Sequence, residues 1–258
     1  MYRPRIIPIL LLKNSGLVKS VKFKNHRYIG DPINAVRIFN DLKADELAFI
    51  DITASKEKRL IPLDFVKKVG EEANMPFSVG GGIRNIQDIR KIIEVGAEKV
   101  ILNTIAGENP KFVQQAVKEF GSSTITVCMD VKRDFFGKNK VMIQAGSKKI
   151  VQSPLIFAKQ MEEMGAGEII IQSIDNDGTM LGYDLELIAG ISEQLSIPVT
   201  ALGGAGSLTD MMDLYQKTSV NGLAAGSLFV YHGPRRAVLV NYPSQTEISN
   251  TLQSREFQ

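Results

Sequence analysis

An internal repeat is the feature that most constrains the fold of this chain. "VGGGIRN" (79–85) is echoed by "LGGAGSL" (202–208), so that Gly80 and Gly203 stand 123 positions apart. Three further pairs follow in chain order at spacings of 119 to 123 positions: 7–14 with 126–133, 44–52 with 166–174, and 97–104 with 220–227. Four matches at nearly constant spacing indicate that one half of the fold is a duplicate of the other.

Short apolar runs alternate with longer amphipathic ones. The runs rich in Ile, Val, Leu and Ala predict strands over 5–12, 47–52, 76–79, 98–103, 124–130, 168–173, 198–202 and 221–225. Helical patterns cover 31–42, 85–96, 109–121, 153–167 and 184–195. This rhythm predicts a single α/β domain over residues 1–258, a (β/α)₈ TIM barrel with half-barrels at roughly 1–121 and 122–258. A doubly wound open sheet usually has fewer strands and no reason to repeat.

The composition excludes several classes of protein. A net charge of +3 with interleaved acids and bases argues against a nucleic-acid partner. The lone Cys128, with only His26 and His232, predicts no metal site, and nothing indicates a cofactor. The apolar start stops at Lys13, which favours a core strand over a signal peptide. No apolar run approaches the ~20 residues of a membrane span. The expected location is the cytoplasm.

Glycines follow the third strand, in the first half, and the seventh strand, at the equivalent place in the second half. Their backbone N–H groups can converge on an anion near a helix N-terminus, and the next strand of each half ends in a small polar group. Tight turns alone would explain one such pair, but the duplication favours two phosphate cradles on opposite sides of the barrel mouth. The members of the two cradles that carry this argument are Gly81, Gly82, Asn103 and Thr104 in one half, and Gly204, Gly226 and Ser227 in the other.

Acids also stand where strands end. Asp51 and Asp130 each close an apolar strand, which makes them candidates for general acid–base chemistry. The loop 173–179 adds Asp175, for which catalysis and capping of its own loop are equally good interpretations. Asp177, followed by Gly178, fits a turn at least as well as a site.

A second charged set lies at the strand starts. Arg5, Glu46, Lys99 and Glu168 stand at or just before the first residue of four strands. Their side chains could close an ion-paired ring in the bottom of the barrel, since buried charge persists only when it is paired. Spacing alone favours four solvated charges on an exposed rim.

The motifs together resemble the HisF family, the cyclase subunits of imidazole glycerol phosphate synthase. "RIIP", "ADELAFIDITAS", "VGGGIR", "AEKVILNT", "SIDNDGT", "GYDLEL" and "GGAG" stand in HisF order and spacing over nearly the whole chain. The resemblance implies a barrel that binds a HisH-like glutaminase on its N-terminal face. Ammonia then crosses the barrel and joins a phosphoribulosyl substrate with two phosphates.

The resemblance also assigns residues. It places the four-charge set on the family's gate to the ammonia passage, which reverses the preference from spacing. It assigns both cradles to phosphate binding and adds Asp177 and Gly178 to the second. Lys19 falls on a lysine of the first loop, 13–30, which we expect to act as a mobile lid. Asp130 falls on one of two catalytic aspartates.

The departures from the family surround the active site. Leu11 replaces the other catalytic aspartate, and Gln172, Asn176 and Leu202 replace further family residues. Together with the ending "GSLFVYHGPRRAVLVNYPS" (226–244), they resemble paralogues associated with acetamidino modification of surface-polysaccharide sugars. Three functions stay open: an ammonia conduit serving an ATP-dependent sugar amidotransferase, a true cyclase (a lyase of histidine biosynthesis), and a catalytically silent assembly subunit.

Overall fold

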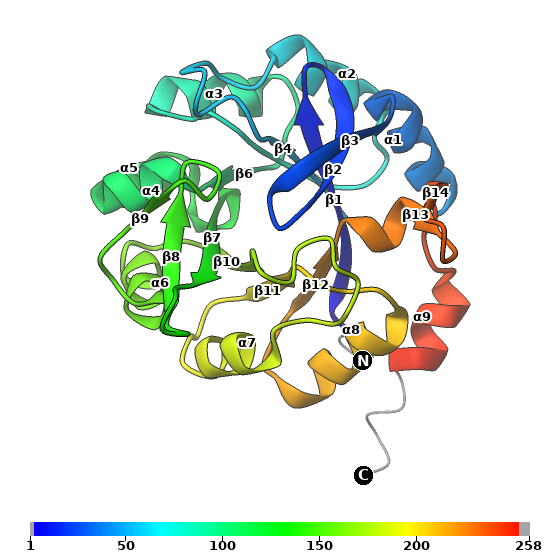
Figure 1. The fold of residues 1–258 in the computed structure, drawn as a ribbon. Coiled ribbons are helices and arrows are strands. Elements are labelled where there is room, and N and C mark those ends of the chain that lie inside the picture. Colours follow the sequence, from blue (N-terminus) through cyan, green and yellow to red (C-terminus); the bar gives the residue numbers. More distant parts are fainter. Residues whose placement is uncertain (1–2, 253–258) are drawn as a thin grey trace.

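Eight parallel strands close into a barrel in the computed structural model, which describes residues 3–252 (Figure 1). Neighbouring strands pair in chain order, and the ring closes where β12 pairs with β1. The barrel strands are β1 (Arg5–Lys13), β4 (Leu47–Asp51), β5 (Phe77–Gly80), β6 (Lys99–Leu102), β7 (Ile125–Arg133), β10 (Glu168–Ser173), β11 (Val199–Leu202) and β12 (Gly222–Ala225). The predicted TIM barrel is therefore confirmed.

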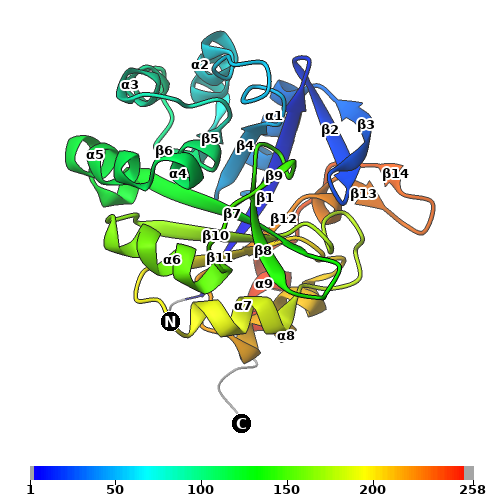
Figure 2. The same ribbon diagram turned by 60° about the vertical axis from the view of Figure 1, so that its left-hand side comes forward.

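Helices cover the outside of the barrel in both views (Figures 1 and 2). They are α1 (Pro32–Asp41), α2 (Leu63–Glu72), α3 (Ile86–Glu94), α4 (Thr104–Glu108), α5 (Pro110–Phe120), α6 (Pro154–Glu163), α7 (Leu185–Ser192), α8 (Leu208–Lys217) and α9 (Gln245–Leu252), with short 3₁₀ turns at Ser122–Thr124 and Ser227–Phe229. Helix α1 begins as its sequence predicts, because the Asp31 carboxylate accepts the N–H of Asn34 and Pro32 occupies the first turn.

The strands are buried on both faces, which explains their continuous apolar runs. On the outer side Phe39, Phe49 and Phe157 fill the layer between strands and helices. On the inner side a smaller cluster, including Ile9 and Ile170, fills the barrel itself. The strand bounds match the predicted ones to within one residue except in β7, which ends three residues later.

Two antiparallel hairpins extend the sheet at the C-terminal ends of the strands. Strand β1 continues beyond the barrel and pairs with β2 (Gly16–Val21), which pairs with β3 (Lys24–Gly30). Strand β7 likewise pairs with β8 (Asn139–Ile143), which pairs with β9 (Lys148–Lys149). The expectation of a loop over 13–30 is therefore wrong, because that segment is a paired hairpin.

A third, short hairpin joins β13 (Tyr231–His232) to β14 (Ala237–Val238). Residues 1–2 and 253–258, the ends of the predicted domain, lie outside the described residues. Within residues 3–252, no helix is long and apolar enough to cross a membrane.

Candidate site inside the barrel

A cavity of about 250 Å³ opens at the C-terminal ends of the strands. Strands β1, β4, β5, β6 and β7 and the segments that follow them line it. It brings together the predicted residues Leu11, Asp51, Asp130, Gly81, Gly82, Asn103 and Thr104. The C-terminal face is where TIM barrels carry their active sites.

Asp130 is a buried acid of this cavity. It is 6% exposed, and the Cys128 thiol donates to its Oδ1 over 3.6 Å. Burial, reinforced by the negative charge of Asp177, raises the pKa of the Asp130 carboxyl to about 7. Leu11 lines the same cavity from β1 and offers no group that could exchange a proton. One acid therefore stands where a two-carboxylate mechanism needs two.

The other two candidate acids already have partners. Arg59 donates to both oxygens of Asp51, and the backbone N–H groups of Thr53 and Ala54 donate to Oδ1. These contacts fix the segment after β4 that forms one wall of the cavity. Asp175 accepts the Arg133 backbone N–H over 2.8 Å, which ties the end of β7 to the loop after β10.

The first cradle is open to the cavity. Gly81 and Gly82 have φ values of +132° and +72°, a region that favours glycine. No residue with a side chain could replace Gly82, because a Cβ at this position would lie 1.8 Å from the Arg59 carbonyl oxygen. Asn103 and Thr104 border the same space where α4 begins. Backbone N–H groups and a hydroxyl can hold an anion in such a place.

The second cradle is nearly filled. It encloses a space of only about 20 Å³. Lys19 of β2 lines this space together with Asp177, Gly178, Gly204, Gly226 and Ser227.

Lys19 is 5% exposed, and its Nζ donates to the Ile9 carbonyl over 2.5 Å. A Cβ at Gly226 would lie 2.3 Å from this Nζ. Burial lowers the pKa of Lys19 to about 8, against the opposing charge of Asp177. Burial also raises the pKa of Asp177, although Lys19 opposes that shift. Here the hairpin holds its lysine inside the second cradle.

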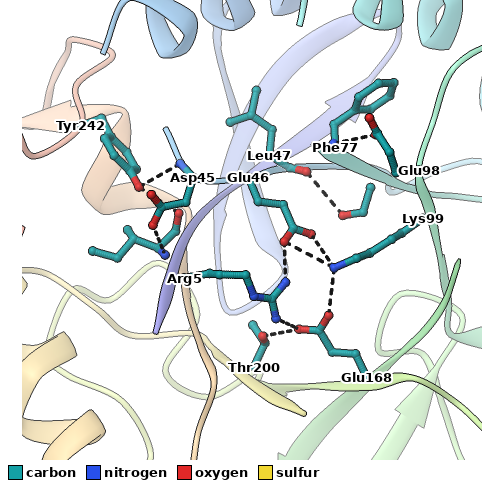
Figure 3. A network of polar contacts seen from close by, with 12 residues as sticks. Arg5, Asp45, Glu46, Leu47, Phe77, Glu98, Lys99, Glu168, Thr200 and Tyr242 are labelled. Atoms are coloured by element: carbon teal, nitrogen blue, oxygen red, sulfur yellow. Dashed lines mark hydrogen bonds and ion pairs between the residues drawn. The ribbon is translucent and has the colours of Figure 1, made fainter. Parts of the chain in front are cut away.

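An ion-paired ring closes the opposite end of the barrel (Figure 3). The Arg5 guanidinium donates to Glu46 over 2.5 Å and to Glu168 over 2.6 Å, and Lys99 Nζ lies 3.3 Å from both acids. Glu46 and Glu168 are buried, at 5% and 7% exposure. The interpretation as four solvated charges is therefore wrong. Burial alone would raise the pKa of Glu168, but Arg5 and Lys99 hold it below its usual value.

The sequence analysis did not predict two contacts, one at the charge ring and one at the second cradle. The Thr200 hydroxyl, fully buried on β11, donates to Glu168 Oε1 over 2.5 Å (Figure 3). Arg236, from the segment before β14, donates to the carbonyls of Gly178 and Thr179 at the second cradle. Neither has a local signal, because a threonine in a core strand and an arginine in a turn are common everywhere.

The protein is therefore a (β/α)₈ barrel of a particular class. Its interior charge ring lies at one end and its glycine cradles lie at the other. The family model described as "Histidine biosynthesis protein" matches residues 5–234, and the chain belongs to this family. Within it, the chain is HisF-like.

Its relatives carry HisF names. The chain is 46% identical over 248 residues to a protein of Leptospira borgpetersenii, covering 96% of this chain and 98% of the relative. It is 43% identical over 248 residues to a protein of Pseudomonas aeruginosa, covering 96% and 99%. Both carry the name "Putative imidazole glycerol phosphate synthase subunit", HisF in the first and hisF2 in the second. An "Imidazole glycerol phosphate synthase subunit HisF" of Alkaliphilus metalliredigens is 43% identical over 232 residues, covering 90% and 92%.

Proposed function

We propose that this barrel is the ammonia-conducting subunit of a glutamine-dependent amidotransferase system. It receives ammonia from a HisH-like glutaminase and passes it toward acetamidino modification of a surface-polysaccharide sugar. The observation that carries the proposal is Leu11, which faces the same cavity as Asp130 while the charge ring at the other end stays complete. The four residues that the resemblance assigns to the ammonia gate are present, whereas Leu11 stands where the resemblance expects one of two catalytic acids.

The barrel interior suits neutral ammonia. Above the ring the inner wall is apolar, with Ile7, Ile9, Ile101, Ile170 and Leu202 buried side by side. Moving a charged ammonium ion or a hydrogen-bonding water chain past such a wall costs more than moving one small neutral molecule. Ammonia must also pass Arg5 and Lys99, so the ring acts as a gate that opens when an ion pair separates.

The glutaminase partner binds the N-terminal face in this account. Arg5 and Lys99 reach the surface there, with side chains 27% and 23% exposed, while their acidic partners are buried. A partner bound over this face would cover the outer side of the ring. The relatives' names describe subunits of a synthase, in agreement with such an assembly.

The sugar-modifying role rests on the departures around the site. Gln172 and Leu202 line the second, filled cradle, and Asn176 lies in the loop beside it, where its amide donates to the Gly182 carbonyl. The ending 226–244 takes part in the same region, since Arg236 binds the loop carbonyls at that cradle. The second cradle, about 20 Å³, has little room for a second phosphate, as expected of a barrel that has given up the cyclase substrate.

The true cyclase is the second candidate. Asp130 and the open first cradle favour it, and so do the names of the relatives. In this function a bisphosphorylated ribotide would react with ammonia at the C-terminal face to give imidazole glycerol phosphate and aminoimidazole carboxamide ribotide. The filled second cradle and Leu11 oppose it.

Nitrogen tracing tests the conduit. The barrel is combined with its HisH-like glutaminase and an ATP-dependent sugar amidotransferase, and amide-¹⁵N glutamine competes with unlabelled ammonium in solution. We expect ¹⁵N to dominate in the product, and Arg5→Met to lower its share. Arg3→Met is the control, because Arg3 pairs with Asp45 outside the ring. Equal use of both nitrogen sources by the unmodified barrel would refute conduction.

A further inference from the structure

The turn between β7 and β8 carries two aromatic side chains that lie in solvent. Phe135 is 97% exposed and Phe136 is 82% exposed, and their rings meet edge to face with centroids 5.6 Å apart. A single exposed apolar side chain is ordinary, but two adjacent aromatic rings form a patch that a partner can bury. We call Phe135 and Phe136 the aromatic tip.

The backbone holds the aromatic tip in one conformation. The Asp134 carboxylate accepts the N–H groups of Phe136 and Lys138, both over 2.9 Å. The main chain closes the same turn, because the Gly137 N–H donates to the Asp134 carbonyl and the Asp134 N–H donates to the Lys138 carbonyl. A turn that is ordered before it binds loses little conformational entropy when a partner covers it. The tip is therefore pre-organised for docking.

Basic residues surround the aromatic tip. The segment "KRDFFGKNK" (132–140) holds four basic residues and one acid, a surplus of three positive charges that equals the net charge of +3 of the whole chain. Lys140 pairs with Asp134 over 3.7 Å. Lys132 and Lys138 are exposed, and neither forms an ion pair within residues 3–252. The surface that complements this segment is an apolar pocket with an acidic rim.

The hairpin that carries the tip borders the mouth of the cavity. Asp130 lines the cavity, and β7 continues from it to Arg133, where the turn begins. Three residues of strand span roughly 10 Å, so the aromatic tip stands above the rim close to the opening. The other turn of this hairpin, between β8 and β9, places Ala145 in the cavity lining. A protein that covers the tip therefore lies beside the opening through which ammonia would leave.

We propose that the aromatic tip is the docking anchor for the ATP-dependent sugar amidotransferase, and that its two rings enter an acidic-rimmed apolar pocket on that enzyme. The partner is taken from the proposed function, so this proposal rests on it. The position of the tip beside the opening suits an enzyme that receives ammonia from the barrel.

An anionic membrane surface complements the tip less well. Asp134 directly precedes the two rings, and hydrogen bonds from the N–H groups of Lys138 and Phe136, aided by Lys140, hold the pKa of its carboxyl below its usual value. The carboxylate therefore stays ionised at the tip. Entry of the rings into lipid would carry this charge toward the hydrocarbon, which is costly, whereas a protein pocket can leave it in water at its rim.

Equilibrium binding of the barrel to the amidotransferase tests the anchor. Phe135→Ser/Phe136→Ser should weaken this binding at least about tenfold, as truncation of aromatic anchors does. Its binding to the HisH-like glutaminase should change by less than about twofold, because that partner binds the opposite end of the barrel. The matched control Ile156→Ser/Leu239→Ser removes two exposed apolar side chains, from α6 and from the segment after β14, and should leave both affinities intact.

The two unpaired lysines provide a second measurement. Lys132→Gln/Lys138→Gln should slow association with the amidotransferase and flatten its dependence on salt, because these charges attract an acidic surface. Lys68→Gln/Lys111→Gln removes the same charge from exposed positions on α2 and α5 and should change neither property.

The outcomes separate the anchor from the conduit. Unchanged affinity for the amidotransferase in the Phe variant would overturn the anchor, and so would failure of the unmodified barrel to bind this enzyme. If the Phe variant lost binding to phosphatidylglycerol vesicles and kept its affinity for the amidotransferase, the partner would be a membrane and the proposal would be wrong. Conduction is judged by the ¹⁵N tracing alone. Equal use of both nitrogen sources beside a complex that depends on the two rings would refute conduction and support the anchor.

Discussion

Leu11 and Asp130 line one cavity from β1 and β7, and the carboxyl of Asp130 has no acidic counterpart on β1. The variant Leu11→Asp places a second carboxyl in this space. Two neighbouring acids in a poorly solvated site resist ionisation, so their pKa values rise above the unfolded value. The variant should therefore lose stability as pH rises. We expect the loss of unfolding free energy to be about 1–3 kcal/mol larger at pH 8 than at pH 5.

Urea denaturation at the two pH values measures this effect. Leu11→Asn is the control, because it loses the same apolar contacts without adding a charge. Equal losses for the Asp variant at pH 5 and pH 8 would show that the new carboxyl does not interact with Asp130 or with the apolar wall.

Asp130 itself makes stability depend on pH. Its folded pKa of about 7 lies above the unfolded value, so the folded chain binds the extra proton between those two pKa values. The contribution of Asp130 to the free energy of unfolding therefore falls as pH rises toward 7 and stays low at higher pH. Asp130→Asn removes this dependence and should gain about 2–4 kcal/mol relative to the unmodified chain between pH 5 and pH 8. Asp213→Asn, at an exposed helical position, should produce no such gain.

The interior ring should stabilise the folded state most at neutral pH. Arg5→Met leaves Glu46 and Glu168 with Lys99 alone, and breaking such buried pairs should cost about 2–4 kcal/mol at pH 7. Because the folded pKa of Glu168 is lowered, the contribution of the ring is present above the unfolded pKa and is lost as pH falls through the folded one. The cost should shrink toward pH 4. A cost that does not vary with pH would mean that the ring contributes packing rather than ion pairing.

Thr200 holds Glu168 in this ring. Thr200→Val keeps the shape of the side chain and removes one donor from a buried carboxylate, at an expected cost of about 1–2 kcal/mol. Thr200→Ser should recover most of it. In the nitrogen-tracing assay the Val variant should also lower the share of glutamine-derived nitrogen, whereas Thr218→Val, whose hydroxyl donates to the Leu214 carbonyl, should not.

The sequence predicted the barrel because each strand is a continuous apolar run between helical patterns, and the structure confirms this. It did not predict β3, whose residues "KNHRYIG" are polar and largely exposed. Strand formation there depends on pairing with β2, not on an apolar face. The same pairing carries Lys19 into the second cradle, which no local pattern could indicate.

The site shows the same limit. Strand starts placed Arg5 and Glu168 at one end of the barrel, but whether they are solvated or paired depends on the register of eight strands. Asp51 closes a strand as a catalytic acid would, yet Arg59, eight residues later, turns back to neutralise it. The sequence did not predict this ion pair, although the two residues are near each other in the chain. The reason is that residues 52–58 fold into a turn whose conformation cannot be inferred from their composition.

The most direct test of the central claim is a cyclase assay. The purified barrel is given the bisphosphorylated HisF substrate and saturating ammonium salt, beside the HisF relative of Alkaliphilus metalliredigens. With Leu11 in place of an acid, we predict turnover at least ~10²-fold below that of the relative. Turnover within about tenfold of the relative would contradict the account, because one missing general acid–base group should cost more than that.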